Sequence, residues 1–246
     1  MERNAVEKVL VTGGAGFIGS HLVDRLMSQD YKVTVLDNLS SGSLNNLEQW
    51  FPNPNFIFIK GDLKNPQIIE KATKQTDLVF HFAANPEVRV GETEPCVHFE
   101  ENLVATFNLL EALRKEGSAH TIVFASTSTV YGEATVLPTP EDYGPSVPIS
   151  TYGASKHGAE ALMSAYAHTF DLRAVILRFA NIVGPRATIG VIVDFIRKLR
   201  KDPSCLEVLG DGTQRKSYIY IDDCIDAVVC AVDTVLKGTC RVDFYN

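Results

Sequence analysis

The sequence has few cysteines, and none of them is spaced like a disulfide or zinc pair. There are five, an odd number, and no two are separated by two residues. Secreted disulfide frameworks use an even set of cysteines, and structural zinc sites use closely spaced pairs. We therefore expect no disulfide and no bound metal, and we expect a reducing, cytoplasmic location.

Long apolar runs and an excess of basic charge are also missing. The apolar runs fall well short of the roughly 18 to 20 residues that cross a bilayer, and residues 1–8 contain no apolar core of a signal peptide. The 23 lysines and arginines are outnumbered by 30 acidic residues, and the net charge is −7. Proteins that bind a phosphate backbone carry a basic face. The sequence therefore predicts neither a membrane nor a nucleic-acid partner.

What is present is a repeated alternation of short β-branched runs and longer amphipathic stretches. The pattern predicts strands at 8–12, 32–36, 56–60, 78–82, 121–125 and 174–178, and helices at 17–28, 66–73, 95–115 and 151–169. Apolar strands separated by helices form a parallel sheet that is covered on both faces. The predicted fold class is α/β, a Rossmann-type doubly wound parallel sheet with helices on both faces.

The pattern is looser beyond residue 181. It predicts helices at 189–201 and 222–237, and strands at 206–209, 218–221 and 240–245. Asp222 and Asp223 open the last helix, and we interpret them as its cap rather than as metal ligands.

After the first strand, the glycines Gly13, Gly16 and Gly19 form a G-x-x-G-x-x-G turn. Such a turn lets the backbone approach a pyrophosphate at the N-terminus of the next helix. Asp37 ends the second strand, where a carboxylate would bind the adenosine ribose hydroxyls. Because that carboxylate would repel a ribose 2′-phosphate, the pattern predicts NAD rather than NADP.

Two further strand ends fit the same cofactor. Asp62 and Leu63 follow the third strand and could frame an adenine, and small residues, Ala83 and Ala84, follow the fourth. We interpret His81, inside the apolar fourth strand, as a hydrogen-bonded core histidine rather than a catalytic base.

Tyr152 and Lys156 are four residues apart in a predicted helix and therefore share one face. A neighbouring ammonium favours the phenolate and would lower the tyrosine pKa from about 10, as acid–base catalysis requires. The strand before this helix continues into Ser126 and Thr127, whose hydroxyls would lie at the carboxyl edge of the sheet. Ligands of open α/β sheets bind at that edge.

Together with the segments 126–132 and 178–186, these motifs resemble the extended short-chain dehydrogenase/reductase superfamily. Within it, they are similar to the UDP-glucose (UDP-galactose) 4-epimerase group of the NAD-dependent epimerase/dehydratase family. The resemblance covers residues 9–246. It implies an NAD cofactor, a UDP-sugar substrate and a homodimer formed through the helices at 95–115 and 151–169.

The resemblance also implies individual roles. Tyr152 would be the general acid and base, Lys156 would bind the nicotinamide ribose, and Thr127 would bind a sugar oxygen. Besides Tyr152 and Lys156, the implied cofactor-binding residues are Gly13, Gly16, Phe17, Ile18, Gly19, Asp37, Asn38, Ser41, Gly42, Asp62, Leu63, Phe82, Ala83, Ala84, Asn102, Ser126 and Phe179. The implied substrate-binding residues are Asn85, Thr127, Tyr152, Asn181 and Lys216. Lys216 stands where the family has arginine and offers a point charge instead of a bidentate fork; a solvated basic loop is the alternative.

The reaction implied by the resemblance inverts C4 of a UDP-hexose through a 4-keto intermediate, with hydride passing to NAD⁺ and back. Related dehydratases carry an Asp-Glu pair after the threonine, whereas Ser128 and Thr129 follow Thr127 here. Two alternatives remain open. One is an epimerase or reductase acting on UDP-glucuronate, a UDP-N-acetylhexosamine or another nucleotide sugar, and the other is a catalytically inactive NAD(H)-binding protein.

We divide the chain into an NAD-binding Rossmann core, residues 1–181, and a partial nucleotide-sugar lobe, residues 182–246. The lobe is interleaved with the last helix and strand of the core, so that the two form one compact unit. Family members extend past the strand that 240–245 resembles, so we expect the small C-terminal substrate lobe to be incomplete.

Overall fold

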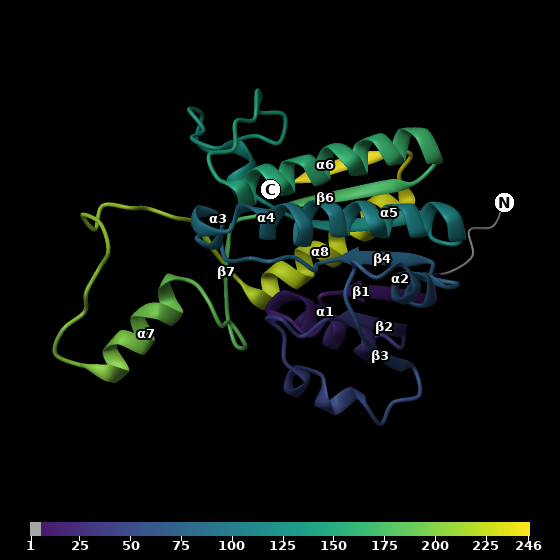
Figure 1. Ribbon diagram of the computed structural model, residues 1–246, viewed down its shortest axis with the longest axis horizontal. Helices are drawn as coiled ribbons and strands as arrows, with labels where there is room; N and C mark the ends of the chain where they lie inside the picture. Colours follow the sequence, from purple (N-terminus) through teal and green to yellow (C-terminus); the bar gives the residue numbers. More distant parts are fainter. Residues whose placement is uncertain (1–5) are drawn as a thin grey trace.

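The computed structural model describes residues 6–246 and is built around one parallel sheet (Figure 1). Its seven strands lie in the order β3-β2-β1-β4-β5-β6-β9, and every neighbouring pair is parallel. Their bounds are β1 Lys8–Thr12, β2 Lys32–Asp37, β3 Phe56–Lys60, β4 Leu78–His81, β5 Thr121–Thr127, β6 Arg173–Phe179 and β9 Val242–Tyr245. Strand order reverses between β1 and β4, which confirms the doubly wound fold and creates the switch point where such sheets bind ligands.

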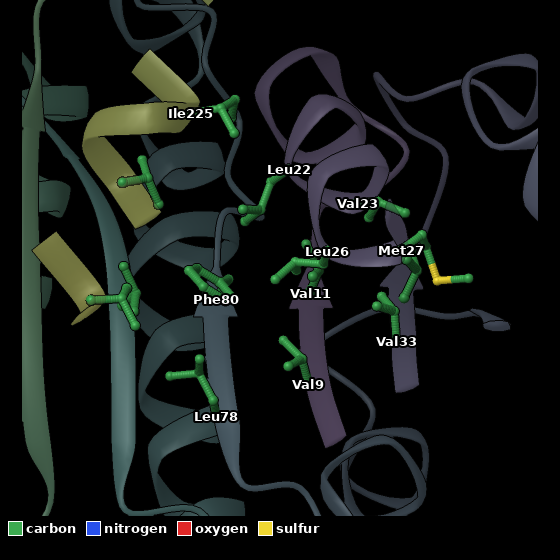
Figure 2. Close-up of a cluster of buried hydrophobic side chains, with 14 of the residues drawn as sticks. Val9, Val11, Leu22, Val23, Leu26, Met27, Val33, Leu78, Phe80 and Ile225 are labelled. Carbon is green, nitrogen blue, oxygen red and sulfur yellow. The ribbon is translucent and has the colours of Figure 1, made fainter. Parts of the chain in front are cut away.

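Helices cover both faces of the sheet and bury its apolar side chains. The helices α1, Phe17–Ser28, and α8, Ile221–Lys237, cover one face, and α2, Pro66–Thr73, α5, Ala105–Glu116, and α6, Thr151–Phe170, cover the other. On the first face, the leucines and valines of α1 pack against the valines of β1 and β2 (Figure 2). Burying each of these side chains contributes about 2 kcal/mol, and together they fix α1 behind the glycine turn.

The helix predicted at 95–115 is interrupted in the structure. It consists of α4, Pro95–His98, a π-helical segment, Phe99–Val104, and α5, and the short α3, Val90–Thr93, precedes it. The π-helical segment contains the buried Asn102. Such π-helical turns are rare within α-helices and frequently occur at functional sites.

A second, smaller unit projects from the sheet layers. The strands β7, Asn181–Val183, and β8, Tyr218–Tyr220, form a two-stranded parallel sheet, and the chain between them carries α7, Val191–Lys201, on an extended arm (Figure 1). The strand predicted at 206–209 is wrong, because that segment is exposed and pairs with no strand. An apolar run forms a strand only where a neighbour takes its backbone hydrogen bonds.

The start of α8 also differs from the sequence interpretation. Tyr220 is at the N-cap, and Asp222 and Asp223 lie in the first turn without capping it through a side-chain hydrogen bond. Their charges instead face the positive end of the helix dipole. α8 packs against α1, and β9 pairs with β6, so the end of the chain belongs to the main sheet layers. The domain boundary at residue 181 stays a prediction.

Two further searches cover the described residues only. Between residues 6 and 246, no helix is long and apolar enough to span a membrane. The same part of the chain contains no group of three His, Cys, Asp or Glu side chains that could hold a metal ion.

Candidate active site

A cavity lies at the carboxyl edge of the sheet, across the switch point between β1 and β4. Its wall contains most of the residues that the sequence pointed to. These are Gly13, Gly16, Phe17, Ile18, Gly19, Asp37, Asn38, Ser41, Asp62, Leu63, Phe82, Ala83, Ala84, Ser126, Thr127, Tyr152, Lys156 and Phe179. Residues from six strand ends and two helices therefore meet at one place.

The glycine turn is shaped so that only glycine fits. Gly13 has a φ of +71°, and a Cβ there would lie 2.6 Å from the backbone nitrogen of Ala83. A Cβ at Gly19 would collide with the carbonyl oxygen of Gly13. Gly16 is at the N-cap of α1 and has no side chain to accept from the first-turn N–H groups. These N–H groups can bind an anion, so the turn fits the pyrophosphate of a dinucleotide.

Asp37 lies beside this turn, and most of its surface is buried. One carboxylate oxygen accepts a hydrogen bond from the backbone N–H of Ala15 at 2.9 Å, and the other from that of Leu39 at 2.8 Å. Burial raises the pKa of Asp37, and the two backbone hydrogen bonds act against that shift. The remaining lone pairs can accept ribose hydroxyls, because each carboxylate oxygen takes two donors.

The other end of the cavity holds the tyrosine and lysine of α6. The Ser150 side chain caps this helix by accepting from the N–H of Gly153 at 3.0 Å, which places Tyr152 and Lys156 on the first turns facing β5. Tyr152 shares a hydrogen bond with Thr127, the last residue of β5. The Lys156 ammonium donates to the carbonyl oxygen of Ala125 at 2.8 Å and lies 4.6 Å from the centre of the Phe124 ring.

The pKa values at this end differ from the sequence prediction. Burial raises the pKa of Tyr152 to about 12, and the hydrogen bond with Thr127 only partly opposes it. Burial lowers the pKa of Lys156 to about 7, opposed by the negative charge of Glu160. The expected lowering of the tyrosine pKa by Lys156 is therefore wrong for this structure, because desolvation dominates. The positively charged nicotinamide ring of NAD⁺, if bound near Tyr152, would lower the pKa of its phenol.

Several predicted residues lie behind the wall or away from it. Asn102 accepts from the N–H of Asn85 at 2.7 Å and donates to the Ser155 hydroxyl at 3.1 Å, so it joins the loop after β4 to α6. Asn181 donates to the carbonyl oxygen of Ser217, and Lys216 is exposed. Gly42 packs on Ala15. Direct ligand contacts by Gly42, Asn85, Asn102, Asn181 and Lys216 stay predictions.

The cavity wall also contains residues that the sequence reasoning missed. Glu101 lies next to Asn102 in the π-helical segment, and its carboxylate accepts from the side-chain amide of Asn85 at 3.1 Å. Ile189 and Gly190 reach the wall from the start of the arm. The position of Glu101 next to Asn102, a predicted cofactor-binding residue, was a usable signal in the sequence. Nothing in the apolar periodicity marks the arm.

The structure confirms the interpretation of His81 as a core residue. The ring is completely buried, and its two nitrogens lie 2.8 Å from the hydroxyls of Thr12 and Thr106. Because both ring nitrogens are hydrogen-bonded inside the core, His81 cannot reach a ligand in the cavity.

Comparison with known proteins agrees with this geometry. The chain matches the NAD dependent epimerase/dehydratase family over residues 9–243. A putative UDP-glucose 4-epimerase of Methanocaldococcus jannaschii is 38% identical, over 92% of this chain and 73% of its own length. UDP-glucuronic acid decarboxylase 3 of Arabidopsis thaliana is 35% identical, over 90% of this chain and 65% of its own length.

A solved structure extends the comparison to the fold. The crystal structure of a UDP-galactose 4-epimerase is 49% identical to this chain, with a TM-score of 0.87, and the match covers 97% of this chain and 76% of that one. The glycine turn, the shared parallel sheet and the family match over residues 9–243 lead to one conclusion. The chain belongs to the NAD-dependent epimerase/dehydratase family, and its cofactor is NAD.

Proposed function

We propose that the protein inverts C4 of a neutral UDP-hexose, interconverting UDP-glucose and UDP-galactose. The observation that carries the proposal is the meeting of Tyr152, Thr127 and Lys156 at one end of a cavity whose other end fits a dinucleotide. The bound NAD would supply a hydride acceptor that returns the hydride within the same cycle. Each remaining step belongs to side chains of this chain.

Tyr152 would take the proton of the C4 hydroxyl and return it. Its hydroxyl is paired with Thr127, so a sugar oxygen that enters the site can join an existing hydrogen bond. The Lys156 ammonium is fixed by the carbonyl of Ala125 and presents positive charge to the same end of the cavity. When Lys156 is protonated, its charge favours the phenolate as the proton leaves, against the burial that raises the pKa of Tyr152.

The charges on the wall favour a neutral sugar over a uronate. Among the described residues that line the cavity, the carboxylates are Asp37, Asp62 and Glu101, and the single cation is Lys156. Lys156 is already held by the strand. A uronate carboxylate would therefore enter without a partner, and an unpaired charge in a partly buried site is costly. UDP-N-acetylhexosamines, which are neutral at this position, remain the second candidate.

The test is turnover of UDP-galactose to UDP-glucose by the purified chain with added NAD. We expect turnover in the wild type, and a loss of about 10²-fold or more in Tyr152→Phe, the contribution typical of a positioned acid–base group. Tyr152→Phe should still bind NADH. UDP-glucuronate should not be turned over.

The outcomes separate the alternatives. Turnover of UDP-N-acetylglucosamine but not UDP-galactose would keep the mechanism and change the sugar. NAD binding without turnover of any of these sugars would refute the epimerase and favour an inactive NAD(H)-binding protein. The chain spans 65 to 76% of the length of these three matches.

The location and assembly are proposals of the same kind. All five cysteines are free, which suits a reducing cytoplasm. Exposed aromatic side chains on α5 and α6, Phe107 and Phe170, support a homodimer through these helices.

A further inference from the structure

Asp24, on the middle of α1, connects two separate loops to the helix behind the glycine turn. One carboxylate oxygen accepts from the side chains of Gln49 at 2.7 Å and Trp50 at 2.6 Å. The other oxygen lies 2.8 Å from a guanidinium nitrogen of Arg186. The ion pair is largely shielded, since its side chains are only 26% and 28% exposed.

Both loops contribute to the wall of the cofactor cavity. The chain between β2 and Trp50 supplies Asn38, Ser40 and Ser41, and the chain that follows Arg186 supplies Ile189 and Gly190. The loop between β7 and α7 descends beside α1 (Figure 1). Arg186 also donates to the hydroxyl of Ser20, 3.1 Å away, one turn nearer to the glycine turn. Asp24 therefore holds two cavity walls against the helix whose N-terminus fits the pyrophosphate.

The backbone of Arg186 adopts a conformation that costs free energy, and the contacts of its side chain offset this cost. Its φ is +66°, a left-handed conformation that costs a residue with a side chain about 1 kcal/mol. Gly190, four residues further along the chain, also has a positive φ, of +109°. The turn that this creates directs the guanidinium toward Asp24 and Ser20, so the ion pair compensates for the strain.

We propose that Asp24, Trp50 and Arg186 form a two-loop clamp that retains the bound dinucleotide. The clamp acts on cofactor release and touches neither the sugar end of the cavity nor Tyr152. The inference depends on NAD as the cofactor and is independent of which sugar the protein uses.

The test is the dissociation rate of NADH, followed in a stopped-flow chase with excess NAD⁺. Trp50 is the only tryptophan of the chain and is part of the clamp, so energy transfer from its indole to NADH reports the bound state. We expect NADH to leave about three- to tenfold faster from Arg186→Met and from Asp24→Asn, because a half-buried ion pair lies between exposed and buried pairs in strength. The acceleration in the double variant should be smaller than the product of the two single accelerations, since both single variants already remove the Asp24–Arg186 ion pair.

A matched control lies on the same helix. Arg25 pairs with Asp226, at 32% and 62% exposure, and this ion pair joins α1 to α8 rather than to either loop. Arg25→Met should release NADH at the wild-type rate. Raising the ionic strength should accelerate release from the wild type more than from Arg186→Met, because salt screens only a pair that exists.

Three results would overturn the clamp: an unchanged rate in Arg186→Met, an equal acceleration in Arg25→Met, or multiplying effects in the double variant. If Asp24→Asn fails to fold, by circular dichroism, Arg186→Met decides alone. That variant leaves the contacts of Asp24 with Gln49 and Trp50 in place.

Discussion

The buried His81 shows how one side chain can be fixed beside an active site without taking part in it. The Thr106 hydroxyl donates to the carbonyl oxygen of Asn102, so it can accept only from the Nε2–H of His81. Nδ1 is then the acceptor for the hydroxyl of Thr12. This chain of hydrogen bonds assigns a neutral ring with the proton on Nε2 and joins β1 to the π-helical segment.

Because the folded protein keeps the His81 ring neutral, its free energy of unfolding decreases as the pH falls. Burial, with a smaller contribution from the Lys156 charge, lowers the pKa of His81 to about 3. An unfolded histidine titrates near 6.5, so between these values the unfolded state binds one proton more than the folded state. Stability due to the neutral ring is therefore present above pH 6.5 and is lost as the pH falls toward 3.

We predict that His81→Gln reduces this loss. Between pH 7 and pH 5, the free energy of unfolding of the wild type should fall by about 2 kcal/mol more than that of the variant. Urea unfolding at the two pH values measures the difference. Equal losses in both proteins would show that His81 is already protonated in the folded state.

At this scale the sequence predicted the positions of the side chains better than their electrostatics. The spacing of Tyr152 and Lys156 predicted their shared face, and the structure places both at the cavity. It could not show that Lys156 donates to Ala125 or that burial outweighs the ammonium in setting the pKa of Tyr152. Those outcomes depend on how deeply a side chain lies and on which carbonyl it meets, and neither is encoded in spacing.

At the scale of elements, a buried ion pair joins α6 to the neighbouring strands β5 and β6. Glu160 of α6 accepts two hydrogen bonds from Arg178 of β6, at 3.0 and 2.8 Å, and another from the hydroxyl of Ser126 in β5. Arg178 is 7% exposed and also donates to Tyr131. Removing one charge would leave the other buried without a partner, which is the costly case for such pairs.

We predict that Arg178→Met lowers the free energy of unfolding by about 3 to 5 kcal/mol. For a chain of this size that corresponds to a fall in melting temperature on the order of 10 °C. Arg178→Met combined with Glu160→Leu should be less destabilised than Arg178→Met alone, because no buried charge remains unpaired. Differential scanning calorimetry provides both values.

The control is Arg241→Met, which removes an exposed ion pair with Asp171 at the opposite, N-terminal end of β6. Its melting temperature should stay close to that of the wild type, since exposed pairs contribute little. A double variant less stable than Arg178→Met would contradict the argument and assign the stabilisation to the pair itself.

The elements themselves were largely predictable because their apolar periodicity is strong. β1, β3, α1 and α2 begin and end where the sequence placed them, and the other strands of the main sheet differ by one or two residues. The failures have local causes. The π-helical turn at Phe99–Val104 leaves the apolar repeat almost unchanged, and the run at 206–209 has β-forming residues but no neighbouring strand.

For the whole molecule, the alternation of strands and helices predicted the doubly wound topology, because parallel strands need helical connections. The same reasoning could not predict the position of the arm that carries α7. α7 has the repeat of an amphipathic helix, but none of its residues is buried, so its packing partner cannot be read from its own pattern. A helical repeat states which face is apolar and leaves open what covers it.

The outer layer formed by α5 and α6 exposes aromatic side chains that suit a partner surface. Phe99, Phe107 and Phe170 are 58%, 44% and 44% exposed. The ring of Tyr166 contacts both Phe107 and Phe170, so the last two belong to one continuous cluster across the two helices. The helices lie side by side on the face of the sheet (Figure 1). Contiguous exposed aromatic surface of this kind marks association sites more often than free surface.

We predict that the protein is a homodimer through this layer and that Phe107→Glu converts it to a monomer. A buried carboxylate facing its own symmetry copy would meet both desolvation and like-charge repulsion, because a two-fold interface brings the same patch from each subunit together. Sedimentation equilibrium at micromolar concentration measures the mass. Ile57→Glu, at a position 56% exposed on the edge strand β3, adds the same charge elsewhere and should leave the dimer intact. A wild type that sediments as a monomer, or an Ile57→Glu variant that dissociates as readily as Phe107→Glu, would remove this interface.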